Sequence, residues 1–223
     1  MQRVLQGFAD EDYVIPPHRV FAGNMVDDAF RLMQKSGHIG KIVVTPPQPT
    51  AIGPAVDAPD LSGCWLITGG TGGFGLATAE WLAAHGASDL WLVSRSGRLP
   101  NDAAMRIEAL GTSVHLRSID VTDPAQVGRL IGEITKNGGG LDGVVHGAAL
   151  FDDGLFDKTD AARITSVLSA KLAGAHNLDR ATRDVPLRHF WMFSSVATRF
   201  GNPGQGAYVA ANMGLEALAH ARN

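Results

Sequence analysis

The chain has 223 residues and a formal net charge of −3, from 19 Lys and Arg against 22 Asp and Glu. Hydrophobic residues make up 45% and charged residues 18%, which excludes a disordered chain. The near-neutral charge argues against a nucleic-acid-binding protein, which would carry a basic surface. A single cysteine, Cys64, excludes a disulfide scaffold and a cysteine metal site.

No apolar run approaches the ~20 residues of a membrane span, and the N-terminus does not begin like a signal peptide. The eight histidines are scattered without the spacing of metal ligands. We therefore expect a soluble, cytoplasmic protein with no metal site, no membrane span and no nucleic-acid partner.

The N-terminal segment contains one helix pattern and one strand pattern. Apolar residues recur at helical spacing from Met25 to Lys35, with Asn24 as the N-cap and Gly37 as the C′ glycine. Ile39 to Val44 is predicted to be a strand. Because these elements bury little surface alone, we expect residues 1–45 to be the end of a preceding domain.

A proline-rich stretch separates this segment from the rest of the chain. Five of the eleven prolines fall within residues 46–62, with no periodic apolar face between them. This composition favours an extended linker. The sequence thus predicts a linker at 46–62 followed by a catalytic domain at 63–223.

Strands and helices alternate in this second part. The predicted strands are Cys64–Thr68, Leu90–Ser94, Val114–Ile119, Leu141–His146 and His189–Phe193. The predicted helices are Leu76–His85, Ala103–Leu110, Pro124–Lys136, Lys158–Arg183 and Ala207–Arg222, with Asp123 as the cap before Pro124. Continuously apolar strands that alternate with helices indicate a doubly wound parallel α/β sheet of the Rossmann type. Since this fold usually has six or more strands, we expect the domain to be truncated at its C-terminal end.

A glycine-rich turn, TGGTGGFG at residues 68–75, follows the first of these strands and leads into a helix. Glycines let the backbone approach a pyrophosphate closely, and the helix N-terminus offers N–H donors. The alternative is an ordinary glycine-rich turn without a ligand. The predicted cofactor contacts of the turn are Thr68, Gly69, Thr71, Gly72, Gly73, Phe74 and Gly75.

The end of the second strand indicates which dinucleotide binds. An NAD-binding site usually has an acidic residue there, whereas this chain has Ser94, Arg95 and Ser96. An arginine can pair with a 2′-phosphate, so the sequence favours NADPH over NADH. The alternative for Arg95 is a solvated side chain. Asp120, after the third strand, either accepts a hydrogen bond from the adenine or caps the turn before Pro124.

Residues near the C-terminus suggest a reducing site. Tyr208 and Asn212 share one face of the last helix, and Ser195 follows the fifth strand. A tyrosine can protonate a carbonyl oxygen, but its usual pKa of ~10 requires a nearby cation to stabilise the anion. Asn212 carries no charge, so Lys171 on the preceding helix is the candidate cation. The alternative for each residue alone is a role in the core.

From about residue 63 to residue 222 the chain resembles the ketoreductase domain of modular polyketide synthases and animal-type fatty acid synthases. These domains belong to the short-chain dehydrogenase/reductase superfamily. The matching stretches are TGGTGGFG, LVSRSG, GVVHGAALFDDGLF, SAKLAGAHNL and MFSSVATRFGNPGQGAYVAANMGLEALA. Most of the superfamily carries Tyr-x-x-x-Lys, whereas these domains carry Tyr-x-x-x-Asn with the lysine on the preceding helix, as Tyr208, Asn212 and Lys171 do. The resemblance implies that Ser195 is the catalytic serine.

The resemblance also extends the cofactor site to the ends of the third and fourth strands. Besides Asp120, the residues that it adds there are Val121, His146, Gly147 and Ala148. The family usually has His-Ala-Ala-Gly where this chain has His-Gly-Ala-Ala at 146–149. The methyl group of Ala149 either crowds the cofactor or shifts the turn.

A second family motif, Leu-Asp-Asp, occurs here as Phe151-Asp152-Asp153. In the family its second aspartate accompanies reduction to the D (R-configured) 3-hydroxyl, which the resemblance assigns to Asp153. The tryptophan of the opposite stereochemical class would fall near Phe200 and is absent. The alternative for Asp153 is a carboxylate on a surface loop.

The N-terminal segment is similar to the end of an enoylreductase domain, through Phe30 to Met33 and Gly37 to Val44. In reducing synthases that domain directly precedes the ketoreductase. The resemblance implies NADPH-dependent reduction of a β-ketoacyl thioester on an acyl carrier protein, within a homodimeric synthase. We also expect the 223 residues alone to be inactive. The alternatives are a non-catalytic cofactor-binding fragment and a free-standing reductase of small ketones.

Overall fold

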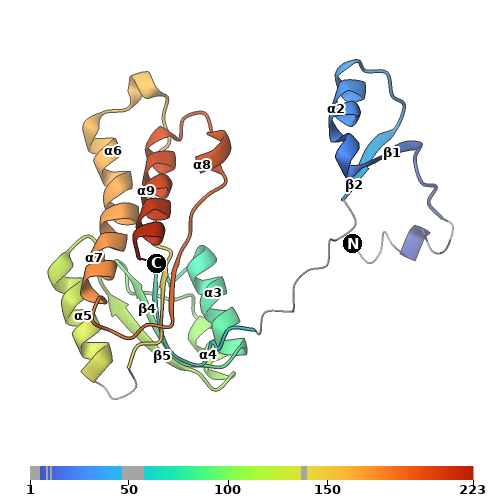
Figure 1. Ribbon diagram of the computed structural model, residues 1–223. Coiled ribbons are helices and arrows are strands. Elements are labelled where there is room, and N and C mark those ends of the chain that lie inside the picture. Colours follow the sequence, from blue (N-terminus) through green and yellow to red (C-terminus); the bar gives the residue numbers. More distant parts are fainter. Residues whose placement is uncertain (1–5, 9, 11, 47–57, 137–139, 223) are drawn as a thin grey trace. The chain divides into compact units, whose positions relative to one another are not determined.

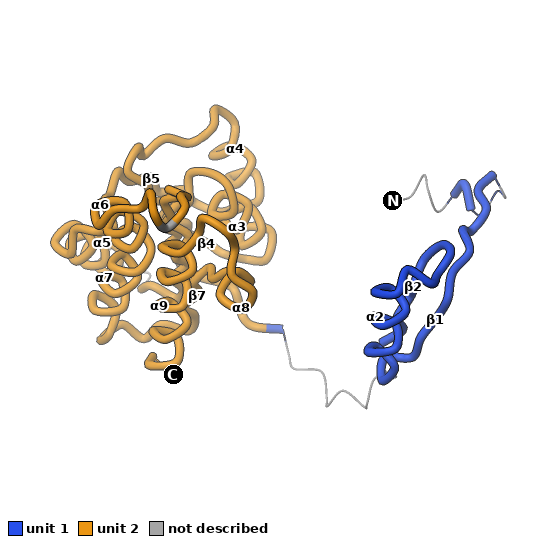
Figure 2. The backbone as a smooth tube through the Cα atoms, turned by 90° about the horizontal axis from the view of Figure 1, so that it is seen from above, with its two compact units in different colours: residues 1–58 blue, residues 59–223 orange. Residues whose placement is uncertain are grey.

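A computed structural model describes residues 6–8, 10, 12–46, 58–136 and 140–222. The chain forms two compact units, Met1–Ala58 and Pro59–Asn223, which Figure 2 shows in different colours. Most of the predicted linker, residues 47–57, lies outside the described residues.

Within residues 12–46, the first unit contains two parallel strands and one α-helix. Strand β1 (His18–Ala22) pairs with β2 (Lys41–Thr45), and the chain between them forms the 3₁₀ turn η1 (Gly23–Met25) and the helix α2 (Val26–Gln34). The sequence predicts the start of β2 too early and misses β1. Because nearly every side chain of β1 is exposed, the strand has no alternation that a pattern could detect.

Both predicted caps of α2 are wrong. Asn24 lies within η1, and the residue at the N-cap is Met25, which makes no side-chain capping bond. At the other end, Ser36 has a φ of 49°. Its N–H bonds to the carbonyl of Met33, and the Gly37 N–H bonds to that of Leu32. This is the Schellman pattern with Ser36 at C′ and Gly37 one position later.

The second unit has a parallel sheet with strand order β5-β4-β3-β6-β7. The strands are β3 (Gly63–Thr68), β4 (Ala87–Ser94), β5 (Ser113–Ser118), β6 (Gly143–His146) and β7 (His189–Met192). In chain order within this unit the sheet reads 3-2-1-4-5, so the direction of winding reverses between β3 and β6. The predicted doubly wound α/β fold is confirmed, and its switch point, where ligands bind in such sheets, lies at the ends of β3 and β6.

Helices cover both faces of this sheet (Figure 1). The helices of this unit are α3 (Gly73–Ala84), α4 (Ala103–Glu108), α5 (Pro124–Lys136), α6 (Ala161–Leu168), α7 (Gly174–Ala181), α8 (Ala197–Phe200) and α9 (Gly206–Arg222), with a 3₁₀ turn η2 (Phe156–Lys158) and a π-helical turn η3 (Ser169–Ala173). Leu66 packs toward α5 and α7, whereas its neighbours Trp65 and Ile67 pack toward α3 and α4. The alternating side chains of each strand thus fill two cores, as two covered faces require.

The helix predicted at Lys158–Arg183 is three segments in succession, α6, η3 and α7. It begins after Asp160, whose carboxylate accepts a hydrogen bond from the Arg163 N–H at 2.8 Å. Helix α3 begins at Gly73, before the predicted Leu76. The predicted cap at Asp123 is confirmed, because its Oδ1 accepts from the N–H groups of Ala125 and Gln126.

Gly143 illustrates how tightly the sheet packs. A Cβ at this position would lie 2.3 Å from the ring of Trp65, which is fully buried. We expect Gly143→Ala to lower the free energy of unfolding by about 1–3 kcal/mol through overpacking. In the control Gly128→Ala, on an open face of α5 with nothing within 4 Å, stability should rise by about 0.5–1 kcal/mol. Urea denaturation measures both, and equal effects would contradict this account of the packing.

Candidate active site

The glycine turn between β3 and α3 depends on close backbone contacts. Gly69 and Gly73 have positive φ angles of 67° and 51°. A Cβ on Gly75 would lie 2.2 Å from the carbonyl oxygen of Gly69, and one on Gly69 would lie 2.8 Å from that of Gly147. Larger side chains therefore cannot occupy these positions without moving the backbone.

The outer side of the same turn is open. A Cβ on Gly72 or Gly73 would meet nothing within 4 Å, and Gly72 caps α3 without a side-chain bond. The first N–H groups of α3 have no partner within the helix, and its dipole is positive at this end. Phe74, 83% exposed, lies beside them. This cradle fits the pyrophosphate of a dinucleotide.

Ser94 ends β4 at the same edge, and Arg95 and Ser96 follow it. Ser94 Oγ lies 3.2 Å from Ser96 Oγ and accepts from the Gly97 N–H at 3.1 Å. Arg95 is exposed, and no carboxylate pairs with it among the described residues. Its guanidinium is therefore available for an anion.

Several residues predicted to contact the cofactor have buried side chains, so their side chains do not face the open edge. Thr68 and His146 are 0% and 1% exposed and lie within hydrogen-bond distance of each other beneath the turn. Val121 belongs to the core, at 7%. Asp120 Oδ1 accepts from the N–H and the hydroxyl of Thr122, at 2.9 and 2.8 Å. These side chains support the edge, and Asp120 stabilises its turn as the alternative interpretation expects.

Gly147 and Ala148 continue from β6 beside the turn. Their N–H groups donate to the carbonyl and the hydroxyl oxygen of Thr68, at 3.0 and 3.3 Å. A Cβ on Gly147 would lie 3.0 Å from the Thr68 carbonyl oxygen. A glycine at 147 therefore allows a close approach between this segment and the glycine turn.

Lys171 lies in the π turn η3 and is 3% exposed. Its Nζ donates to the carbonyl oxygen of Phe193 at 2.7 Å and lies 5.3 Å from the ring centroid of Tyr208. Burial lowers the pKa of Lys171 to about 8. The structure thus brings together the predicted cation and the predicted acid from two separate helices.

Asn212 is completely buried one helical turn after Tyr208. Its Nδ2 donates to the carbonyl oxygen of Tyr208 at 2.8 Å, while its Oδ1 has no partner among the described residues. A buried acceptor without a partner is costly. A hydrogen-bond donor would satisfy it.

Ser195 lies two residues before the start of α8, and its Oγ accepts from the Ala197 N–H at 3.2 Å. A residue that the sequence analysis missed, Glu216, fixes this segment to α9. Its Oε1 accepts from the hydroxyls of Ser194 and Thr198, at 2.7 and 2.9 Å. These bonds lower the pKa of Glu216. The sequence does contain a signal for Glu216, because it lies four residues after Asn212 and therefore on the same face of the last helix.

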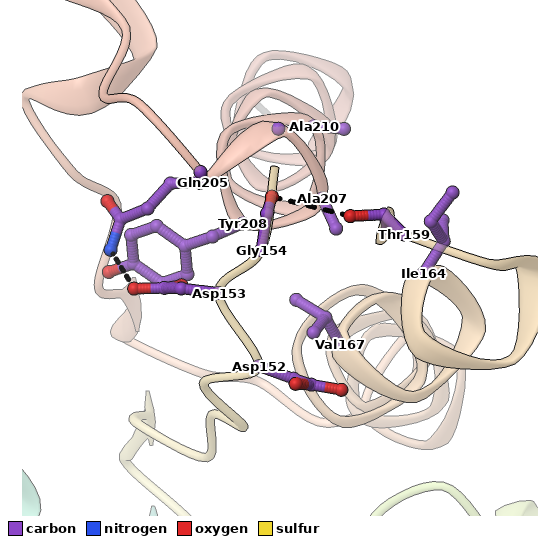
Figure 3. A pocket seen from close by; sticks show the side chains of 12 residues that line it. Asp152, Asp153, Gly154, Thr159, Ile164, Val167, Gln205, Ala207, Tyr208 and Ala210 are labelled. Atoms are coloured by element: carbon purple, nitrogen blue, oxygen red, sulfur yellow. Dashed lines mark hydrogen bonds between the residues drawn. The ribbon is translucent and has the colours of Figure 1, made fainter. Parts of the chain in front are cut away.

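A cavity of about 460 Å³ lies beside Tyr208, between α9, α6 and the loop before η2 (Figure 3). The lining residues are Asp152, Asp153, Gly154, Thr159, Ile164, Val167, Gly204, Gln205, Gly206, Ala207, Tyr208 and Ala210. Asp153 Oδ2 accepts from Gln205 Nε2 at 2.8 Å, and Arg163 pairs with Asp152. The structure therefore places Asp153 at a cavity that Tyr208 also lines.

Comparison with known proteins gives the family. A family model described as KR domain matches residues 63–223. The polyketide synthase GfsB of Streptomyces halstedii is 46% identical over 162 residues, which cover 71% of this chain and 3% of that protein. The chain belongs to the ketoreductase (KR) domains of modular polyketide synthases. These domains are part of the short-chain dehydrogenase/reductase superfamily.

Further relatives agree with this assignment. A phenolphthiocerol/phthiocerol polyketide synthase of Mycobacterium tuberculosis is 38% identical over 237 residues, which cover 100% of this chain and 11% of that protein. A solved ketoreductase from the first module of phoslactomycin biosynthesis, from a Streptomyces species, superposes with a TM-score of 0.71 at 34% identity. That match covers 77% of this chain and 40% of the other. The chain therefore spans a small part of the length of these synthases.

The described residues contain neither a cluster of metal-ligating side chains nor a helix that could span a membrane. In the described part of the KR domain and the preceding unit, no three His, Cys, Asp or Glu side chains lie together as metal ligands would. Among the described helices, none has the length and hydropathy that a membrane span requires.

The buried Lys171 of the KR domain should cost stability while it is charged. Its pKa is lower in the folded protein, about 8, than the ~10.4 of an unfolded chain. The folded state is therefore penalised fully below pH ~8, and the penalty disappears as the pH rises toward ~10.4. We expect Lys171→Met to raise the free energy of unfolding at pH 7 by about 1–3 kcal/mol and by much less at pH 10.

Urea denaturation at the two pH values tests this prediction. The control is Lys158→Met, which changes an exposed lysine and should alter stability little at either pH. A gain for Lys171→Met that is the same at pH 7 and pH 10 would contradict the assigned cost of burial.

Proposed function

We propose that this KR domain reduces the β-keto group of an acyl thioester, carried on an acyl carrier protein, to a 3-hydroxyl group with NADPH. The observation that carries the proposal is the Lys171 ammonium, buried 5.3 Å from the Tyr208 ring centroid. Lys171 donates to the carbonyl oxygen of Phe193, the residue directly after β7. The Lys171–Tyr208 pair therefore lies at the carboxyl ends of the strands, where the glycine turn also lies.

The glycine turn and the segment after β4 would hold the cofactor. Gly69, Gly72, Gly73 and Gly75 shape the open cradle at the N-terminus of α3, flanked by Thr71 and Phe74. Arg95 would pair with the 2′-phosphate, with the hydroxyls of Ser94 and Ser96 beside it. The backbone of Gly147 and Ala148 would border the nicotinamide. NADPH supplies the hydride for the carbonyl carbon.

Tyr208 would donate the proton to the substrate's carbonyl oxygen. The Lys171 ammonium stabilises the phenolate that remains, and the Ser195 hydroxyl donates a hydrogen bond to the oxygen as negative charge develops there. The Oδ1 of Asn212, which has no partner among the described residues, would accept from a water molecule or from Lys171. That donor would then return a proton to the tyrosine.

The cavity beside Tyr208 would take the acyl group. Asp153, fixed by Gln205, lies at this cavity, which supports its role in directing reduction toward the D (R-configured) alcohol. The size of the cavity suits a small ligand.

We further infer the neighbours of the domain. The mycobacterial relative aligns with the whole chain, including residues 1–45, which supports placing that segment in the same kind of synthase. The resemblance of its residues is what suggests the end of an enoylreductase domain. The substrate would arrive on a carrier protein, and the synthase would act as a cytoplasmic homodimer.

The role of Tyr208 is tested by Tyr208→Phe in the intact protein. Without the hydroxyl the proton donor is lost, so we expect kcat for a 3-oxoacyl thioester to fall by about 10²- to 10⁴-fold. The rate is measured from the decrease in NADPH absorbance. The control is Tyr13→Phe, which changes the only other tyrosine, 52% exposed in the first unit. Near-wild-type turnover by Tyr208→Phe would refute the proposed mechanism.

The choice of cofactor is tested by Arg95→Ala. Loss of charge-assisted hydrogen bonds to a 2′-phosphate should lower kcat/KM for NADPH by about 10- to 100-fold and leave the value for NADH nearly unchanged. Arg98→Ala, a neighbouring exposed arginine, serves as the control. Equal losses with both cofactors would show that Arg95 does not select NADPH.

A further inference from the structure

His146 connects the glycine turn to the buried lysine. It ends β6, pairing in the sheet with Thr68 of β3 and with Met192 of β7. Its Nδ1 lies 2.7 Å from the hydroxyl oxygen of Thr68, and its Nε2 lies 2.7 Å from the main-chain carbonyl oxygen of Lys171. One buried ring thus touches both parts of the site.

The partners of His146 define its protonation. A carbonyl oxygen only accepts, so Nε2 must carry a proton and donate to Lys171. In the neutral ring Nδ1 then accepts from the Thr68 hydroxyl, whose oxygen accepts in turn from the Ala148 N–H at 3.3 Å. Burial, together with the nearby Lys171 charge, lowers the pKa of His146 to about 4, so the ring stays neutral at physiological pH.

The carbonyl that His146 binds belongs to a widened helical turn. In η3 the Gly174 N–H bonds to the carbonyl oxygens of Ser169 and Lys171. Gly174 also lets the ring approach, because a Cβ there would lie 3.1 Å from His146 Cε1 and 2.8 Å from a methyl of Val121. Since π turns are rare and need compensation, a strong donor to this carbonyl stabilises the distortion.

We propose that His146 is a positioning residue of the KR domain: by bridging Thr68 and the Lys171 carbonyl, it fixes the π turn that directs the Lys171 ammonium toward Tyr208. The ammonium itself is held from the other side by the carbonyl oxygen of Phe193. Phe193 in turn donates its N–H to the His146 carbonyl oxygen at 3.3 Å. The placement of the lysine therefore depends on His146 through both its side chain and its backbone. This inference rests on the proposed roles of Lys171 and Tyr208.

Two substitutions separate the two bonds of the ring. In His146→Gln the side-chain amide reaches the position of Nε2 and can still donate to Lys171, whereas in His146→Asn it reaches only the position of Nδ1 and can still meet Thr68. We expect His146→Asn to lower kcat by about 10- to 100-fold with little change in KM, because a small displacement of a catalytic group costs this much. His146→Gln should retain at least about ten times the kcat of His146→Asn.

The measurements are kcat and KM with a 3-oxoacyl thioester, NADPH affinity by fluorescence, and thermal stability, all on the intact protein. A merely structural role would lower kcat in step with stability in both variants. Equal kcat values for the two variants, or wild-type turnover by His146→Asn, would overturn the inference. If neither variant binds NADPH, Thr68→Val tests the bridge from its other end: a kcat about three- to tenfold lower supports the proposal, and an unchanged kcat overturns it.

Lys171→Met distinguishes this inference from the proposed function. If Lys171→Met keeps wild-type turnover, the proposed role of the lysine is wrong and the positioning role falls with it. If Lys171→Met loses turnover while His146→Asn does not, only the positioning role of His146 is wrong.

Discussion

The burial of one ammonium group organises the active site. Lys171 is almost fully enclosed, yet within the described residues its Nζ donates a single hydrogen bond, to the carbonyl oxygen of Phe193. Removing a charge from water is expensive unless partners compensate. The face of Tyr208 provides a second favourable contact. The enclosed cation therefore ties together η3, the end of β7 and α9, which are far apart in the chain.

The strand order explains why the other segments of the proposed active site lie close to Lys171. All five strands of the second unit are parallel, so their carboxyl ends lie at one edge of the sheet. The glycine turn, the Ser94–Ser96 segment, residues 147–148 and the Ser194–Ser195 segment each follow one of these strands. The reversal of winding between β3 and β6 separates the helices on either side and leaves room for a ligand.

Side-chain hydrogen bonds connect the loops at this edge to the neighbouring helices. Glu216 fixes the segment with Ser195 to the helix with Tyr208. Arg163 orders the loop at the cavity, because it pairs with Asp152 and donates to the Asp153 carbonyl. Asn212 Oδ1 differs from these groups, since it lies buried without a partner in the described part of the chain. This oxygen is therefore the acceptor through which the proposed proton relay would pass.

Local sequence determined the alternation of strands and helices, the glycine turn and the cap at Asp123, because each depends on residues close together in the chain. The motifs also predicted a reducing site at Lys171, Ser195, Tyr208 and Asn212, from residue types and an order that resemble those of a known family. Local patterns failed where distant contacts decide the outcome. The exposed strand β1 forms only through its pairing with β2. Helical periodicity over residues 158–183 cannot reveal the π turn η3, whose Lys171 carbonyl oxygen is contacted by His146 of strand β6.

Burial was likewise decided by the tertiary structure. The sequence assigned Thr68, His146 and Val121 to the cofactor, and only the packed sheet shows that their side chains lie beneath the edge. A motif indicates which residues lie near a ligand. Whether a given side chain faces that ligand or the core depends on the neighbouring strands and helices.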